Sequence, residues 1–265
     1  MACNLLENKA FLDDNQYTEE NIAHYELIFG KQFVSTGGET TLEGFGQKLQ
    51  LKPGDNVLDF GSGLGGSAFY LASTHEVNVL GVDLSQNMIM KANDYLDAAN
   101  PQIKKHVQFE LRDVNERGFS PKSFDCIFTR ETIVHIQNKL ELFKNFHEWL
   151  VEGGKLLISD YCLGPNPSSH EFQGYIKSRN YNMIPLSEYK VLLQKVGFTH
   201  VEVTDMTDIC IEILNRDVQR LHAMKQELLL KLSVEEYEHI VAGWEKKLNR
   251  CLNGNQGWGM IFANK

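Results

Sequence analysis

The stretch from Asn56 to Ala72, NVLDFGSGLGGSAFYLA, constrains the fold of this chain more than any other. Val57 and Leu58 run into Asp59 and Phe60 as a short apolar strand, glycines then crowd a turn, and the turn opens into a helical pattern. Glycine permits a tight turn and lets a ligand approach bare backbone and the amides at the helix start. The stretch therefore predicts a strand, a glycine loop and a helix that together bind a ligand.

Two acidic residues indicate which ligand the glycine loop suits. Asp59 ends the first strand, where a carboxylate would repel the pyrophosphate of a dinucleotide and attract a cation. S-adenosylmethionine carries a sulfonium and an α-ammonium group and no phosphate, so it suits this position. Asp83 ends the next strand, at the spacing expected for a carboxylate that binds ribose hydroxyls. The alternatives are that both acids merely cap strand ends, or that the chain is a nicotinamide dehydrogenase, which Asp59 disfavours.

Apolar runs of strand length alternate with helical patterns from Asn56 onward, which is typical of a parallel sheet covered by helices on both faces. The predicted strands are 56–60, 78–83, 107–112, 124–129, 155–160, 201–205 and 258–263. Seven strands with the last at the C-terminus match the methyltransferase variant of the doubly wound fold. We therefore predict an α/β protein with a seven-stranded, mostly parallel sheet.

The segments around this alternation are expected to form one domain, 1–265. Residues 1–50 are predicted to be an N-terminal helical lid, with one helix from Thr18 to Gly30 and a second over 39–49. Residues 51–160 form the predicted cofactor-binding core, in which Ser85 starts one helix and 141–150 form another. Residues 161–265 hold the C-terminal strands and two substrate-binding inserts, namely 161–185 and a helical pair, 209–232 and 234–252. Ligands in open α/β sheets bind beyond the carboxyl ends of the strands, where these inserts overhang.

Charge and composition exclude several classes of partner. A net charge of −9 and a pI near 5.5 argue against a nucleic acid, which would require a basic face. No window reaches the length of a membrane span, and the N-terminus lacks the apolar core of a signal peptide. The five cysteines lack CxxC spacing and the nine histidines form no recognisable ligand cluster. We expect a cytoplasmic monomer without membrane insertion, metal or nucleic acid.

Six segments resemble the phosphoethanolamine N-methyltransferases, a family that converts phosphoethanolamine to phosphocholine with S-adenosylmethionine and releases S-adenosylhomocysteine. The segments are NQYTEENIAHYELIFGKQFVSTGG (15–38), VLDFGSGLGG (57–66), TRETIVHI (129–136), SDYC (159–162), YIKSRNY (175–181) and GWEKKL (243–248). The resemblance covers nearly the whole chain. It implies a cofactor site, which Asp59 joins by its own position, made of Val34, Ser35, Gly61, Gly63, Asp83, Leu84, Asp113, Val114 and Arg130.

The resemblance also implies that Tyr17 and His135 are the catalytic pair. A primary amine with a pKa of about 10.4 is protonated at neutral pH and has no lone pair with which to attack a methyl group. In the family, a tyrosine and a histidine together remove this proton. Histidine titrates near working pH, and a phenol hydrogen-bonded to it can relay the proton and orient the amine.

The substrate's phosphate is expected to bind residues on the inserts. The family's phosphate positions correspond to Arg179, Tyr181, Tyr161 and Lys247, while Tyr25 and Gln16 line the same pocket. Glu131 stands where the family commonly has aspartate; its carboxylate is expected to attract the substrate ammonium, with the preference among the three amines left open.

Two alternatives concern other functions. A sterol or lipid methyltransferase of the same fold would not need Arg179 and Lys247 to converge. A binding protein could keep the fold without catalysis, because a fold alone never proves activity.

Overall fold

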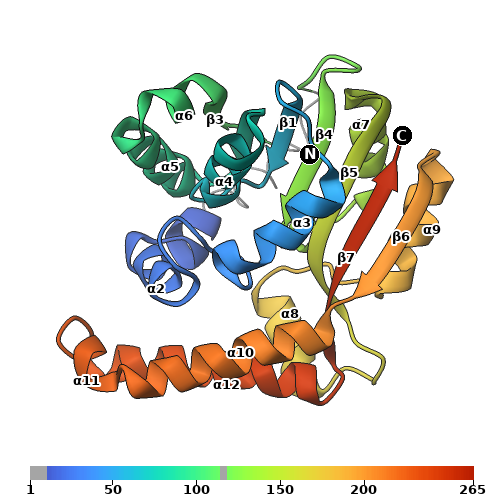
Figure 1. The fold of residues 1–265 in the computed structure, drawn as a ribbon. Helices are drawn as coiled ribbons and strands as arrows, with labels where there is room; N and C mark the ends of the chain where they lie inside the picture. Colours follow the sequence, from blue (N-terminus) through green and yellow to red (C-terminus); the bar gives the residue numbers. More distant parts are fainter. Residues whose placement is uncertain (1–10, 114–117) are drawn as a thin grey trace.

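The computed structural model describes residues 11–113 and 118–265, which form a central sheet with helices on both faces (Figure 1). The strands that these residues form follow the order β3-β2-β1-β4-β5-β7-β6. Their bounds are β1 (Asn56–Phe60), β2 (Asn78–Asp83), β3 (Val107–Leu111), β4 (Phe124–Arg130), β5 (Leu150–Leu163), β6 (Thr199–Asp205) and β7 (Gln256–Asn264). Only β7, among the described strands, runs antiparallel to its neighbours. The predicted α/β class and the seven-stranded, mostly parallel sheet are confirmed.

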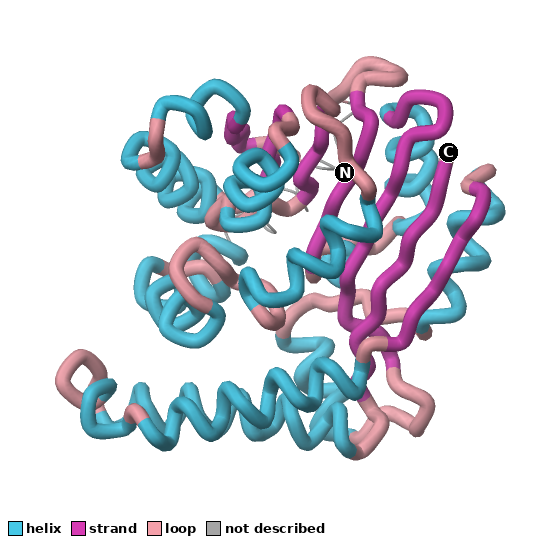
Figure 2. The backbone as a smooth tube through the Cα atoms, viewed as in Figure 1, coloured by secondary structure: helices cyan, strands magenta, loops and turns pink. Residues whose placement is uncertain are grey.

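Helices lie on both faces of the sheet (Figure 2), and each face carries its own apolar cluster. Along β4, Cys126 and Phe128 point to one apolar cluster, and Ile127 points to the other. The first cluster packs under α3 (Leu42–Leu49) and α4 (Gly66–His75), and the second under α7 (Lys139–Trp149) and α9 (Leu186–Val196). The remaining helices at the sheet's edge are α5 (Gln86–Ala98), which Ser85 caps as predicted, and α6 (Pro101–His106).

Strand β5 is longer than predicted. The predicted strand covered 155–160, whereas β5 starts directly after α7 and pairs with β7 from Lys155 to Leu163. The helix that was predicted over 141–150 spans Lys139–Trp149, so it begins two residues earlier and ends one residue earlier than predicted. The difference arises because Leu150 pairs with Phe124 of β4, which draws this residue into the sheet.

The N-terminal region contains a single π-helical turn, η1 (Leu12–Gln16), and helix α2 (Glu19–Phe29). The Thr18 hydroxyl accepts a hydrogen bond from the Asn21 amide at 3.2 Å, and Gly30, at φ 96°, ends the helix as predicted. The second helix is shorter than the predicted 39–49, because its first turn is a 3₁₀ helix, η2 (Gly38–Thr41). These elements carry one side of the cavity described below.

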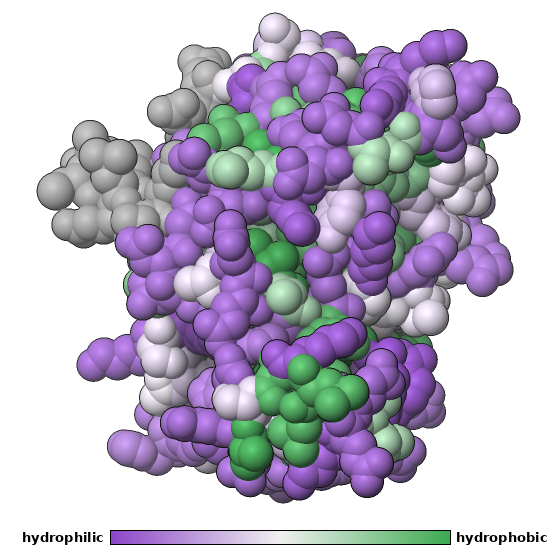
Figure 3. Space-filling model, turned by 90° about the vertical axis from the view of Figure 1, so that its left-hand side faces the viewer, coloured by the Kyte–Doolittle hydropathy of each residue, from purple (hydrophilic) through white to green (hydrophobic). Residues whose placement is uncertain are grey.

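Two helical segments overhang the carboxyl ends of the strands (Figure 1). The first is α8 (His170–Ser178), which follows β5. The second is a hairpin made of α10 (Thr207–Ala223), the short α11 (Lys225–Leu228) and α12 (Val234–Leu252), close to the predicted helical pair. Apolar side chains gather where this hairpin turns, and Leu230 and Val234 there are 85% and 57% exposed (Figure 3). Among the described helices, none has both the length and the hydropathy that crossing a membrane requires.

Candidate functional site

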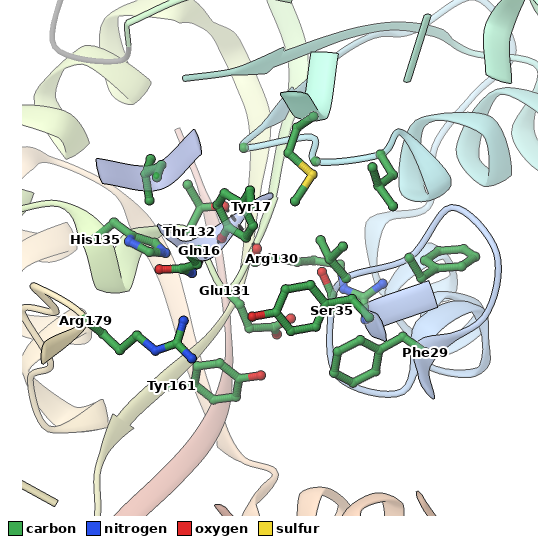
Figure 4. Close-up of a pocket in the computed structure, with 18 of the residues that line it drawn as sticks. Gln16, Tyr17, Phe29, Ser35, Arg130, Glu131, Thr132, His135, Tyr161 and Arg179 are labelled. Atoms are coloured by element: carbon green, nitrogen blue, oxygen red, sulfur yellow. Dashed lines mark hydrogen bonds between the residues drawn. The ribbon is translucent and has the colours of Figure 1, made fainter. Parts of the chain in front are cut away.

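A cavity of about 440 Å³ lies at the carboxyl ends of β1, β2 and β4, under α2 and the hairpin (Figure 4). Its walls include most of the residues that the sequence singled out. They are Gln16, Tyr17, Tyr25, Val34, Ser35, Asp59, Gly61, Gly63, Asp83, Leu84, Arg130, Glu131, His135, Tyr161, Arg179, Tyr181 and Lys247. Asp113 is not among the lining residues, and Val114 lies outside the described residues. The fold thus brings together side chains that are up to 231 positions apart in sequence.

The glycine loop forms the floor of the cavity next to β1. Gly61 and Gly63 have φ values of 77° and 52°, which side chains rarely permit. A Cβ atom added to Gly61 would lie 2.0 Å from Oγ1 of Thr132, so the loop and the segment after β4 touch at this point. The amide of Gly63 donates to Oδ2 of Asp83 at 2.9 Å, which fixes the loop against the end of β2.

Asp59 is the most unusual group in this wall. Its side chain is 2% exposed, and its Oδ2 atom has no hydrogen-bond partner among the described residues. Burial raises the pKa of this carboxyl to about 7; Arg130 opposes the rise and Asp83 adds to it. An unpaired carboxylate oxygen in a buried wall is costly, so a ligand that carries a positive charge and N–H donors fits this place.

Asp83 is held more firmly. Its Oδ1 accepts from the Ser85 amide and its Oδ2 from the Gly63 amide, each at 2.9 Å. Burial raises the pKa of Asp83, and these two backbone donors act against the rise. A carboxylate oxygen has two acceptor sites, so Asp83 both caps the turn and keeps acceptor capacity toward the cavity. The strand-cap interpretation is therefore compatible with ligand binding.

Arg130 ties the N-terminal region to β4. Its guanidinium donates to the carbonyls of Thr36 (2.8 Å) and Gly38 (3.1 Å) and to Oγ1 of Thr41 (2.7 Å). These acceptors belong to a segment that we call the strap, residues 34–41, whose first two residues line the cavity. Arg130 therefore sets the position of Val34 and Ser35 as well as lining the cavity itself.

Glu131 holds the same strap from the other side. Its Oε2 atom accepts a hydrogen bond from the Thr36 amide (3.1 Å), and its Oε1 atom accepts from Ser159 Oγ (2.9 Å) and Trp258 Nε1 (2.8 Å). Its backbone has a φ of 49°, in the left-handed region. The carboxylate thus joins the strap to β5 and β7. The prediction that it attracts the substrate amine stays a prediction, and the structure adds an anchoring role that the sequence had not indicated.

Two cations reach the cavity from the overhanging segments. The Lys247 ammonium donates to the Tyr161 hydroxyl at 2.6 Å, and that hydroxyl is 2.6 Å from Thr36 Oγ1. Arg179 follows α8; burial acts to lower its pKa, but Tyr25, Tyr181 and Tyr175 outweigh burial and raise it. In the described part of the chain, neither cation lies within 4.0 Å of a carboxylate oxygen. In a protein of charge −9, two such cations around one cavity suit an anionic ligand.

Tyr17 and His135 lie on the same side of the cavity (Figure 4). The Tyr17 hydroxyl accepts from Gln16 Nε2 at 3.0 Å, and the His135 ring packs edge-on against Tyr181 with centroids 4.9 Å apart. The expected hydrogen bond between Tyr17 and His135 is not formed among the described residues, because the Tyr17 hydroxyl is bonded to Gln16 and the imidazole packs on Tyr181. Burial, followed by Arg179 and Lys139, lowers the pKa of His135 to about 4, and burial raises the pKa of Tyr17. Both groups are therefore neutral near pH 7, and His135 has a lone pair to accept a proton.

The sequence reasoning overlooked several residues of the site. Trp244 packs against Phe29 and Tyr25, with ring centroids 5.6 and 6.5 Å apart, and Arg250 stacks 3.9 Å from the centroid of Tyr175. All of these side chains line the cavity. Trp244 and Tyr175 stand inside segments that carried the family resemblance, and that position was the available signal. Arg250 left no such signal, because it reads as an ordinary cation near the end of a helix.

A group of possible metal ligands lies apart from the cavity. Within the described ranges, Glu20 and His24 of α2 and Glu236 of α12 bring one ligand atom each within 4.8 Å of one another. None of the three lines the cavity, and Glu236 also closes a capping box with Ser233. The expectation that the chemistry needs no metal stays a prediction.

Comparisons of the domain, the sequence and the structure with known proteins each identify methyltransferases. Residues 39–203 match a family described as a methyltransferase domain. Phosphoethanolamine N-methyltransferase 1 of Arabidopsis thaliana is 44% identical over 255 residues, which cover 96% of this chain and 51% of that protein. The phosphoethanolamine N-methyltransferase of Plasmodium falciparum is 33% identical over 265 residues, 99% of this chain and 98% of that protein. The chain thus spans about half the length of its plant relatives.

A solved structure is similar over nearly the whole chain. Phosphoethanolamine N-methyltransferase 2 of Haemonchus contortus, in complex with phosphomonomethylethanolamine and S-adenosylhomocysteine, superimposes with a TM-score of 0.94 at 35% identity. The match covers 97% of this chain and 60% of that one. Together with the near full-length Plasmodium match, it shows that this chain belongs to the phosphoethanolamine N-methyltransferase family.

Proposed function

We propose that this chain uses S-adenosylmethionine to methylate the nitrogen of phosphoethanolamine, or of its mono- and dimethyl forms, toward phosphocholine. One observation carries the proposal: a single cavity combines the unpaired carboxylate of Asp59 with two cations, Arg179 and Lys247, that have no carboxylate partner among the described residues. The carboxylate suits a cationic donor, and the cations suit an anionic acceptor.

The residues on the β1 and β2 side fit the cofactor. When bound, S-adenosylmethionine supplies an electrophilic methyl group on a sulfonium centre. The orphan oxygen of Asp59 would accept from the α-ammonium group, and Asp83 would accept from the ribose hydroxyls. Asp113 and Val114 stay predicted contacts of the cofactor. Relatives whose solved structures contain S-adenosylmethionine or S-adenosylhomocysteine support this choice.

The substrate is held by its phosphate and activated at its nitrogen. Arg179 can donate two parallel hydrogen bonds to phosphate oxygens, and Lys247 adds a charge from α12 with Tyr161 beside it. Tyr181 lines the same cavity. His135, neutral at working pH, accepts the ammonium proton, while Tyr17 orients the amine. A phosphate dianion bound at Arg179 also offsets one cause of the low pKa of His135, which makes the imidazole more basic once substrate is present.

The aromatic walls suit the methylated products. Tyr17, Tyr25, Tyr181 and Trp244 line the cavity, and their ring faces attract a quaternary ammonium. Methylation ends at that stage because the nitrogen has no lone pair left. A sterol or lipid substrate would leave Arg179 and Lys247 without an anion in the cavity, which favours the phosphobase.

The test is a methyl-transfer assay with phosphoethanolamine, its mono- and dimethyl forms and phosphate-free ethanolamine. We expect transfer to at least one phosphobase and at least about a hundredfold lower kcat/KM for ethanolamine, because the phosphate contacts are missing. Equal rates with ethanolamine, or transfer only to a lipid, would reject the proposal. The cytoplasmic location and the monomeric state stay predictions from the sequence.

A further inference from the structure

Lys139, the first residue of α7, is a buried cation with an unusual set of partners. It is 3% exposed, and its ammonium donates to three backbone carbonyls, those of Ile133 (2.9 Å), Ile136 (2.8 Å) and Asn182 (2.6 Å). No carboxylate of the described residues lies within 4.0 Å of it. Burying a charge costs several kcal/mol, and an apolar residue could fill the same volume. The lysine therefore calls for a role other than packing.

The three carbonyls belong to two segments that meet at the cavity. Ile133 and Ile136 flank His135 in the turn after β4, which we call the base turn, residues 133–137. Asn182 ends the segment that carries Arg179 and Tyr181, which we call the anion loop, residues 179–182. Lys139 donates to both, so it links the segment of the expected base to the segment of the expected phosphate ligands.

Asn182 completes the link between these segments. Its amide donates to the Val134 carbonyl at 2.7 Å, and its Nδ2 donates to the carbonyls of Ile136 (3.2 Å) and Gln137 (2.9 Å). The imidazole of His135 packs edge-on against Tyr181 of the anion loop. The orientation of the ring thus depends on how the two segments sit against each other.

Two carboxyl groups that lie more than 4.0 Å from the Lys139 ammonium help to stabilise its charge. Burial lowers its pKa to about 8, while Asp160 and Glu188 act to raise it. Asp160, itself 1% exposed, accepts from the Tyr189 hydroxyl at 2.6 Å and from the Tyr161 amide at 2.9 Å. The ammonium therefore keeps its three donors for the carbonyls near neutral pH.

We propose that Lys139 is a positioning residue, whose ammonium fixes the spacing between the base turn and the anion loop so that a phosphobase held at Arg179 presents its nitrogen to His135. The proposal rests on the proposed function. A substrate that is held by its phosphate reaches the base only if this spacing is correct. Small displacements of reacting groups, of about 1 Å, reduce rates about a hundredfold.

The experiment compares Lys139→Met with Lys155→Met. Methionine keeps most of the volume and removes the three donors. Lys155 provides a matched control, because its ammonium also donates to two carbonyls, those of Leu49 (2.6 Å) and Gln50 (3.1 Å), and it does not line the cavity. We expect Lys139→Met to lower kcat for phosphoethanolamine about tenfold to a hundredfold while the Kd for phosphocholine changes less than about threefold, since Arg179 and Lys247 remain. Lys155→Met should keep the wild-type kcat.

A second readout separates positioning from loss of stability. His135 faces Lys139, Arg179 and Tyr181, and removal of the Lys139 charge should raise the pKa of His135, which NMR titration of the imidazole measures. Asn182→Ala, which keeps Lys139, should also lower kcat but should leave the pKa of His135 unchanged. This variant replaces Lys139→Met if Lys139→Met fails to fold.

The outcomes that overturn the proposal are distinct. Wild-type kcat in both Lys139→Met and Asn182→Ala would remove the positioning role. Losses of kcat in Lys139→Met and Lys155→Met that simply follow equal losses in Tm would also overturn it, because they would indicate a purely structural lysine. If the wild-type protein methylates no phosphobase in the same assay, the proposed function fails, and the positioning role fails with it.

Discussion

At the scale of single residues, two ionisable side chains of the cavity have pKa values that burial shifts toward the neutral form. Burial raises the pKa of Asp59 to about 7 and lowers that of His135 to about 4. Groups with such pKa shifts cluster at functional sites. A bound ligand can supply the charge or hydrogen bond that the buried group lacks in the folded protein. Each of the two shifts leads to a prediction.

We predict that Asp59→Asn makes the ligand-free protein more stable. The folded carboxyl has a pKa near 7 and the unfolded one near 3.9, so between these values the native state binds more protons, and stability is lost as pH rises. At pH 8 the substitution should raise the free energy of unfolding by about 1 to 4 kcal/mol, and the gain should shrink at pH 5. Urea unfolding at both pH values measures this effect. A variant that is less stable at pH 8, or that still gains full stability from S-adenosylmethionine, would contradict it.

We predict that His135→Ala lowers kcat by at least about a hundredfold, the usual contribution of a positioned general base. Cofactor affinity should stay near the wild-type value, because His135 is not among the groups expected to bind the cofactor. Turnover assays and calorimetric titration with S-adenosylmethionine measure the two quantities. An unchanged rate would remove His135 from the mechanism.

At the scale of elements, hydrogen bonds with two neighbouring residues, Arg130 and Glu131, hold the strap against the sheet. Arg130 binds it through two carbonyls and a hydroxyl, and Glu131 through the Thr36 amide. Thr36 also reaches Tyr161, which in turn accepts from Lys247 of α12. Thr36 therefore joins the part of the cavity that is expected to bind the cofactor to the part that is expected to bind the substrate.

Glu131→Asp should loosen the strap. The shorter side chain cannot reach Thr36, Ser159 and Trp258 together, so at least one buried donor loses its acceptor, at a cost of about 1 to 3 kcal/mol. The KM for S-adenosylmethionine should rise, because Val34 and Ser35 of the strap line the cavity. Thermal unfolding and steady-state kinetics measure both effects. A variant with unchanged Tm and KM would show that the strap does not depend on this carboxylate.

At the scale of the whole molecule, the cavity forms where the N-terminal region, the sheet and the helical hairpin meet. Patterns of residues that are close in sequence predicted much of the fold around this cavity. The apolar strand before the glycine loop and the caps at Thr18 and Ser85 depend on residues a few positions apart. The Glu131 contact with Trp258 and the length of β5 depend on pairing with β7, about a hundred residues away, and no local pattern encodes them. Lys139 likewise reads as a helix start, although its partner Asn182 is 43 positions distant.

Ligand binding should couple the parts that meet at the cavity. With S-adenosylhomocysteine and phosphocholine at about 100 times their Kd, we expect amide hydrogen exchange in α2 and α12 to slow by about a hundredfold, because opening there would release the ligands. Helix α9 contributes no lining residue and serves as the internal control. Mass spectrometry of exchanged peptides measures the effect. Equal protection of α9, or none in α2, would contradict the coupling.

The contact between Gly61 and Thr132 has one more consequence. The turn at Gly61, which is expected to hold the cofactor, and the segment leading to His135 are separated by a space too small for a single methyl group. Any side chain at position 61 would therefore displace Thr132 and, with it, the segment that carries His135 three residues further on. The absence of a side chain at this one position thus allows the glycine loop and the His135 segment to lie in direct contact.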